Sequence, residues 1–176
     1  MSLNGVFAEP MLDSDSYLQR YKNQLIELHK KGILPKHDAT LTYKVYSIRG
    51  SECGAHKSIV LTADDEHFFT VELGFTTVNG KKHIYPVTRQ LPPSSQPKME
   101  YLGTVKAKGQ DLIAKAVAVM KEFGYYFKFC KNCQDFCNKY LEAIGLGEAK
   151  TFTDDEEAAI LMVVGGIIVS LFAMLK

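Results

Sequence analysis

The spacing of apolar residues first predicts a helix within residues 1–40. Its apolar positions recur at intervals of three and four residues: Leu18, Tyr21, Leu25 and Leu28. Ser14 or Asp15 can cap the start of this helix, and Gly32 followed by Pro35 ends it. We expect this N-terminal helical segment to pack on the rest of the protein.

After residue 40 the pattern changes to the two-residue period of a β-strand. Five segments follow this alternation and are separated by turn residues: 41–48, 57–62, 68–75, 83–87 and 101–106. Pro86 lacks the N–H that a strand ladder uses, which predicts that the fourth strand lies at an edge. Helical spacing returns at residues 110–123, and Gly124 provides the stop. A helix, several strands and further helices together predict an α+β fold, with the main domain over residues 41–150.

Residues 158–175 form an uncharged apolar run that follows an acidic cluster at residues 154–157. As a helix this run would span about 27 Å, just enough for a hydrocarbon core of roughly 30 Å. It therefore predicts a transmembrane tail anchor over residues 158–175. The alternative is a buried C-terminal helix of the soluble domain, which the pair Gly165 and Gly166 keeps open.

Composition narrows the classes of function. The chain has 21 basic and 20 acidic residues, and the basic ones are scattered, which argues against a nucleic-acid partner. The four cysteines are Cys53, Cys130, Cys133 and Cys137. Their spacing lacks the two paired motifs of a zinc site, so we expect neither a metal nor another cofactor. The first residues show no basic start and apolar run of a secretory signal, so we expect reduced cysteines in the cytosol.

The segment 131–145 reads as a helix that begins on a cysteine. Asn132 is a good N-cap, and Asp135 three residues later completes a capping-box pair. Cys133 then occupies the first helical position, where unpaired N–H groups and the helix dipole favour a thiolate. This placement predicts that Cys133 is a nucleophile. Cys137, one turn later, is expected to be an ordinary buried cysteine.

A nucleophilic cysteine needs a base, and the base needs a group that orients it. His56 precedes the strand-like segment 57–62, and Glu72 lies on the expected return strand. A hairpin centred near Asp64 would place His56 opposite Glu72 on one face, which predicts a base with its orienting carboxylate. Slipping the register by one residue would favour His67, which is the reserve base.

His56 opens a hairpin that runs to about Gly74, and Asn-Cys-Gln-Asp-Phe follows about sixty residues after it, at residues 132–136. This arrangement resembles the circularly permuted papain-like thiol proteins. These include the lecithin:retinol acyltransferase and NlpC/P60 group and the PPPDE peptidases. The resemblance covers roughly residues 43–144. It implies a permuted papain-like, NlpC/P60-like domain with an antiparallel sheet and a cysteine-bearing helix. It also implies that Cys133 is the nucleophile and His56 the base. Glu72 stands where the acyltransferase group commonly carries a second histidine.

Together these observations predict thiol-dependent acyl transfer or hydrolysis through a Cys133–His56–Glu72 triad. Asn132 and Gln134 are the residues expected at the helix cap and beside the oxyanion. The first expectation is a membrane-tethered lipid acyltransferase or phospholipase-like enzyme on the cytosolic face of an intracellular membrane. A cysteine peptidase or isopeptidase of the PPPDE type, acting on peptide or ubiquitin-like substrates, is the alternative. A non-catalytic, membrane-anchored interaction module on the same scaffold is the third possibility.

Overall fold

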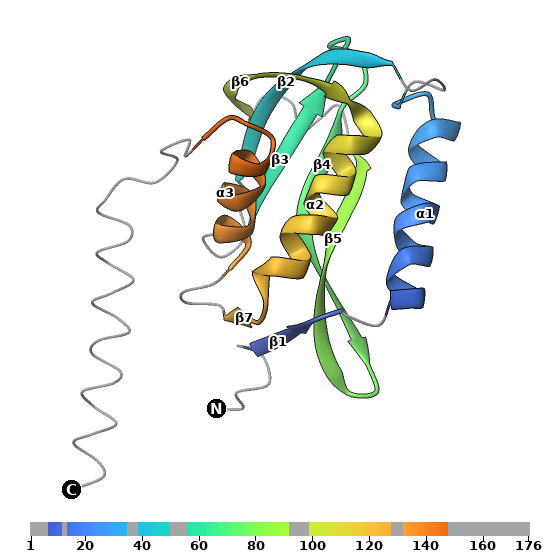
Figure 1. The fold of residues 1–176 in the computed structure, drawn as a ribbon, viewed down its shortest axis with the longest axis vertical. Helices are drawn as coiled ribbons and strands as arrows, with labels where there is room; N and C mark the ends of the chain where they lie inside the picture. The colour runs from blue at the N-terminus through green and yellow to red at the C-terminus, as the bar shows by residue number, and fades with distance from the viewer. Residues whose placement is uncertain are drawn as a thin grey trace, which may run out of the picture.

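The structure is a computed structural model that describes residues 7–11, 14–34, 39–49, 56–91, 99–127 and 132–147 (Figure 1). Five antiparallel strands form the main sheet in the order β6-β2-β3-β4-β5. They are β2 (Thr40–Arg49), β3 (Lys57–Thr62), β4 (Phe69–Val78), β5 (Lys81–Gln90) and β6 (Met99–Lys108). The helices of the described residues are α1 (Ser14–Lys30), α2 (Gly109–Phe123) and α3 (Cys133–Ala143). The α+β prediction is confirmed.

Two short strands extend the sheet beyond β5. β1 (Phe7–Pro10) runs parallel to β5, and β7 (Tyr126–Phe127) pairs antiparallel with β1. The sequence pattern predicted neither strand, because four and two residues are too few to show a two-residue period. β7 is the last described strand before α3 along the chain, so the N-terminal strand pairs with the segment that precedes the cysteine helix.

One face of the sheet is covered by α2 and α3, which lie side by side (Figure 1). The core between the sheet and these two helices holds fully buried side chains from the sheet, including Ile59, Leu61, Val71 and Leu73. Phe123 of α2 and Phe136 of α3 pack edge to face within it, with ring centroids 6.0 Å apart. Burial of each such side chain stabilises the fold by about 1.5–3 kcal/mol. This packing fixes α3, and therefore Cys133, relative to β3 and β4.

Residues before 40 contribute to the same core. Ala8, Leu28 and Leu34 are buried in one cluster with the residues of the sheet and of α2. Gly32 takes a φ of +70° just after α1, which suits its predicted place as the helix stop. The N-terminal segment thus packs on the domain.

The prediction from Pro86 that this strand lies at an edge is wrong, because β5 lies between β4 and β1, but β1 covers only part of its outer side. β1 pairs with β5 only at His83 and Ile84. Further along, the N–H of Thr88 donates to Oε1 of Gln24 in α1, at 3.1 Å, instead of to a strand. The Pro86 nitrogen faces the same side as that of Thr88 two residues later, where no strand needs its proton. The proline therefore marks the part of β5 that β1 leaves uncovered.

The predicted tail anchor at residues 158–175 lies outside the described residues. Within the ranges that the structure describes, no helix has the length and apolar character needed to cross a bilayer.

Candidate active site

The candidate site lies where the N-terminus of α3 meets the start of β3. Cys133 is the first residue of α3 and is buried, with 6% of its surface exposed. Oδ1 of Asn132 accepts the N–H of Gln134 at 2.8 Å, and Oδ2 of Asp135 accepts the N–H of Asn132 at 2.9 Å. The predicted capping box is confirmed. It places the Cys133 side chain in the first turn, where the helix dipole is positive.

Cys137 lies one turn further along α3 and is fully buried. Its Sγ donates to the backbone carbonyl of Lys57 at 3.4 Å, and burial raises the pKa of this thiol. Cys137 is therefore held as a neutral thiol in the core, as the sequence predicted. The two cysteines of α3 have different surroundings, and only Cys133 stands at the capped end.

His56, immediately before β3, joins Cys133 to Glu72. Its Nε2 lies 3.0 Å from Oε2 of Glu72, and its side chain is hydrogen-bonded to that of Cys133. The hydrogen bond with Cys133 and then that with Glu72 raise the pKa of His56 to about 9, against the effect of burial. The structure thus brings together the three side chains of the predicted triad, with the imidazole in the middle.

The register that carries this contact differs from the one we expected. The strand ladder pairs Ser58, not His56, with Glu72, so the expected register is wrong by two residues. A shift of two keeps every side chain on its face, because strand side chains alternate with a period of two. His56 therefore remains on the Glu72 side and reaches the carboxylate diagonally. The difference between the expected and the observed register comes from the turn after β3, where Asp64 accepts the N–H groups of Glu66 and His67.

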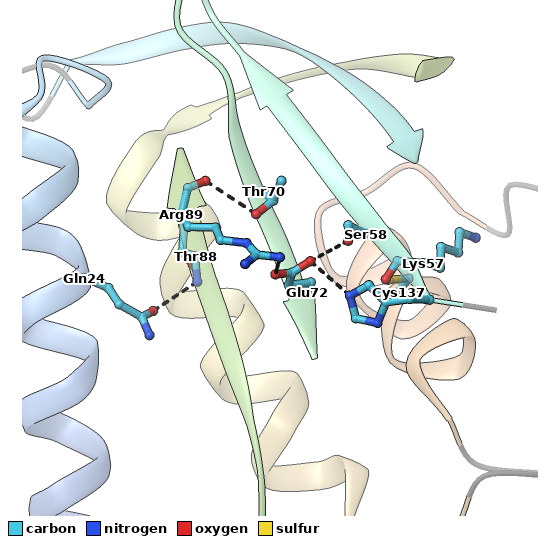
Figure 2. A network of polar contacts seen from close by, with 9 residues as sticks. Gln24, Lys57, Ser58, Thr70, Glu72, Thr88, Arg89 and Cys137 are labelled. Carbon is cyan, nitrogen blue, oxygen red and sulfur yellow. Dashed lines mark hydrogen bonds and ion pairs between the residues drawn. The ribbon is translucent and has the colours of Figure 1, made fainter. Parts of the chain in front are cut away.

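Glu72 is held by three side chains (Figure 2). Its Oε2 accepts the hydroxyl of Ser58 at 2.6 Å as well as the contact from His56, and its Oε1 lies 2.6 Å from Nη2 of Arg89. Burial alone would raise the pKa of Glu72, but the hydrogen bonds from His56 and Ser58 and the charge of Arg89 hold it below its usual value. Glu72 is therefore an ionised carboxylate at neutral pH. Sequence reasoning did not find Ser58 or Arg89, because their approach to Glu72 depends on the observed strand register.

His67, the reserve base, lies at the other end of the hairpin. Its Nδ1 is 2.7 Å from Oδ2 of Asp64 in the turn between β3 and β4, and this hydrogen bond raises the pKa of His67. The six residues of β3 separate that turn from His56, which amounts to about 20 Å along an extended strand. The structure therefore places His67 with the turn and not with Cys133.

Asn132 and Gln134 lie at the start of α3 as predicted. The side-chain oxygen of Asn132 and the backbone N–H of Gln134 satisfy each other in the cap. The structure thus gives Asn132 the capping role. The oxyanion role of both residues remains a prediction.

Tyr126 of β7 is a neighbour of the site that the sequence did not single out. Burial and then the nearby Cys133 raise the pKa of Tyr126 to about 12, so its hydroxyl stays protonated. Its ring packs edge to face on Phe75 of β4, with centroids 4.9 Å apart. The only sequence signal was an aromatic run at residues 125–129, which carried no information about its neighbours.

Across the described residues, no group of three or more His, Cys, Asp or Glu side chains could hold a metal ion. Cys53 and Cys130 lie outside those residues. The chain matches no protein-family model, and comparison with curated proteins and with solved structures also gives no match.

Proposed function

We propose that the protein is a cysteine-dependent acyltransferase or hydrolase in which Cys133 is the nucleophile, His56 the acid–base group and Glu72 the residue that orients His56. The observation that carries this proposal is the position of His56, which is hydrogen-bonded to Cys133 and also lies 3.0 Å from the Glu72 carboxylate. A nucleophile, a base and an orienting group joined in that order are the arrangement that thiol catalysis needs.

The chemistry follows from the protonation of His56. With a pKa of about 9, the imidazole of His56 is protonated at neutral pH. It can then donate one N–H to the Glu72 carboxylate and the other to the Cys133 sulfur. The Cys133 thiolate attacks the carbonyl carbon of an ester or amide and forms a C–S bond. The bond from that carbon to the leaving oxygen or nitrogen breaks, and His56 donates its proton to the leaving atom. Water, or an acceptor hydroxyl or amine, then loses a proton to His56 and attacks the thioester, which releases the acyl group and restores the thiolate.

We further propose that the scaffold is permuted papain-like. The histidine at the start of a strand precedes, along the chain, a helix that begins on the cysteine and packs against an antiparallel sheet. This order of elements agrees with the resemblance that residues 43–144 show to the NlpC/P60-like group. It supports the fold assignment without depending on substrate.

The substrate we propose first is the ester of a membrane lipid. An anchor at residues 158–175 would hold the domain on the cytosolic face of an intracellular membrane and raise the effective concentration of a bilayer substrate. Glu72 in place of the second histidine of the acyltransferase group favours a second candidate, a PPPDE-like peptidase or isopeptidase. A non-catalytic interaction module is the outcome if the thiol proves inert.

The test compares substrate classes on one protein and its Cys133→Ser variant. Purified chain is incubated with phospholipid vesicles, with a soluble acyl ester and with a ubiquitin-like conjugate, and thioester formation on the protein is followed by intact mass. Transfer of an acyl group to the wild type and none to the variant supports the proposal. In parallel, iodoacetamide should label Cys133 faster than Cys137. Equal labelling rates together with no turnover would contradict an enzymatic role.

A further inference from the structure

We infer that Arg89 and Ser58 are positioning residues that lock the Glu72 carboxylate in the orientation from which it holds His56. This inference rests on the proposed function, because it concerns how the orienting member of the triad is itself held. Neither residue contacts the sulfur in the described contacts, so both act through Glu72.

Ser58 and Arg89 together hold both oxygens of the Glu72 carboxylate. Ser58 donates to Oε2 at 2.6 Å, the same oxygen that faces His56, and Arg89 holds Oε1 at 2.6 Å. A carboxylate fixed at both oxygens can neither rotate about its terminal bond nor move away from the imidazole. Figure 2 shows Ser58 reaching Glu72 from β3 and Arg89 reaching it from β5. These contacts assign one oxygen to His56 and the other to Arg89.

The strand register places these side chains together. Ser58 is the ladder partner of Glu72 on β3, so their side chains share one face. Arg89 pairs with Thr70, two residues from Glu72 on β4, and so stands diagonally across the strand boundary on that face. Thr70 in turn donates its hydroxyl to the Arg89 carbonyl at 3.4 Å. Three adjacent strands of one sheet thereby contribute to the support of a single carboxylate.

A glutamate needs such support more than an imidazole does. Its longer side chain loses up to about 1.5–2 kcal/mol of rotamer entropy when fixed, whereas a ring has fewer torsions to fix. Glu72 has only 6% of its side chain exposed, so its charge also needs partners inside the protein. Ser58 and Arg89 meet both requirements. They explain how a buried glutamate can orient an imidazole.

The ion pair between Arg89 and Glu72 differs from an ordinary surface ion pair. The side chain of Arg89 is 65% exposed, and pairs between two exposed groups contribute little to stability. Its partner is buried, however, and that carboxylate also binds His56. We therefore expect Arg89 to act on the position of Glu72, and through it on His56, in addition to compensating the buried charge of Glu72.

The experiment measures the His56 pKa directly, by NMR titration of its ring protons in the full chain, with His56→Gln used to assign the signal. The variants are Arg89→Gln, Arg89→Lys and Ser58→Ala. Arg20→Gln is the matched control, because Arg20 is also an arginine beside β5 but stacks on Tyr85, at 5.3 Å. We expect Arg89→Gln and Ser58→Ala to lower the His56 pKa by about one unit. Arg89→Lys should restore part of the shift, and Arg20→Gln should leave it unchanged.

An unchanged His56 pKa in Arg89→Gln and Ser58→Ala would overturn the inference. A rise in Arg89→Gln would also overturn it, because it would mean that Arg89 only competes with His56 for the carboxylate charge. Circular dichroism of each variant verifies that the fold is retained. The titration requires no turnover. A shifted pKa in a chain that transforms no substrate would therefore refute the proposed reaction and still support the positioning of Glu72 by Ser58 and Arg89.

Discussion

Lys57 Nζ lies 3.1 Å from Asn138 Oδ1, although Lys57 has only 1% of its surface exposed. Lys57 directly follows His56, and Asn138 lies on the helix that begins at Cys133. This contact, together with the contact of Cys137 with the Lys57 carbonyl at 3.4 Å, joins the strand that begins next to His56 to the helix that begins at Cys133. The buried lysine therefore has a structural role, since it helps to fix the distance between β3 and α3.

Replacing Asn138 should weaken that junction. In Asn138→Ala the buried ammonium loses a hydrogen bond, which costs about 1.5–3 kcal/mol of unfolding free energy for a charged donor. Urea unfolding followed by circular dichroism measures the change. Lys139→Ala, at an exposed neighbouring position, is the control and should stay within about 0.5 kcal/mol of the wild type. A loss equally small in Asn138→Ala would mean that the contact does not hold β3 to α3.

Cys133→Ser should abolish turnover and leave the fold intact, because a hydroxyl of similar size replaces the thiol while the capping box is retained. Cys137→Ala is the matched control on the same helix. It removes a buried sulfur and should lower stability by about 1 kcal/mol without changing the rate per folded molecule. Activity assays paired with thermal unfolding separate the two effects. Turnover by Cys133→Ser would contradict the mechanism.

The acid–base assignment predicts a graded series. His56→Ala should lose about 10²–10⁴-fold in kcat/KM, the usual contribution of a general base. Glu72→Gln should lose less, because the imidazole keeps its hydrogen bond to Cys133. His67→Ala should change the rate little, since His67 pairs with Asp64 in the distant turn. If His67→Ala were inactive and His56→Ala active, the assignment of the base would be wrong.

The pH dependence follows from the raised pKa of His56. In the proposed reaction the protonated imidazole is the acid that releases the leaving group, so kcat/KM should fall as the pH rises through about 9. Glu72→Gln removes an interaction that raises this pKa, so the alkaline limb should move to lower pH. Because the pKa of His56 is higher in the folded than in the unfolded state, protonation of His56 also stabilises the fold. This stabilisation is fully present below the unfolded-state pKa near 6.5 and is lost as the pH rises through about 9. Comparison of His56→Gln with the wild type by urea unfolding across that window measures it.

The apolar run at residues 158–175 yields a prediction independent of the site. Val164→Arg places one charge near the centre of the predicted anchor, at a cost of about 2.5–3.5 kcal/mol on insertion scales. The variant should shift from the membrane fraction towards the soluble fraction, and Val164→Leu should not. A wild-type chain that partitions as a soluble monomer, with Ile160, Leu161 and Val164 protected against the domain, would refute the anchor.

Much of the fold was accessible from the sequence because periodicity is a local signal. The strand predicted at residues 57–62 coincides with β3, and the capped helix begins at Cys133 as the pattern of Asn132 and Asp135 requires. The contact between His56 and Glu72 was anticipated because a register error of two residues conserves the face. What local patterns cannot supply is the exact cross-strand alignment, which a single turn decides. For that reason the sequence did not reveal that Ser58 and Arg89 support Glu72, nor that Lys57 meets Asn138.

The position of β1 between β5 and β7 has a consequence for how the molecule folds. A strand at the front of the chain must wait until residues near 126 have been synthesised before one of its two ladders can form. Pairing between segments so distant along the chain raises contact order and slows folding. Because β7 precedes the cysteine helix, the N-terminus of α3 should be among the last parts to become ordered, after the central hairpin of β3 and β4 has formed.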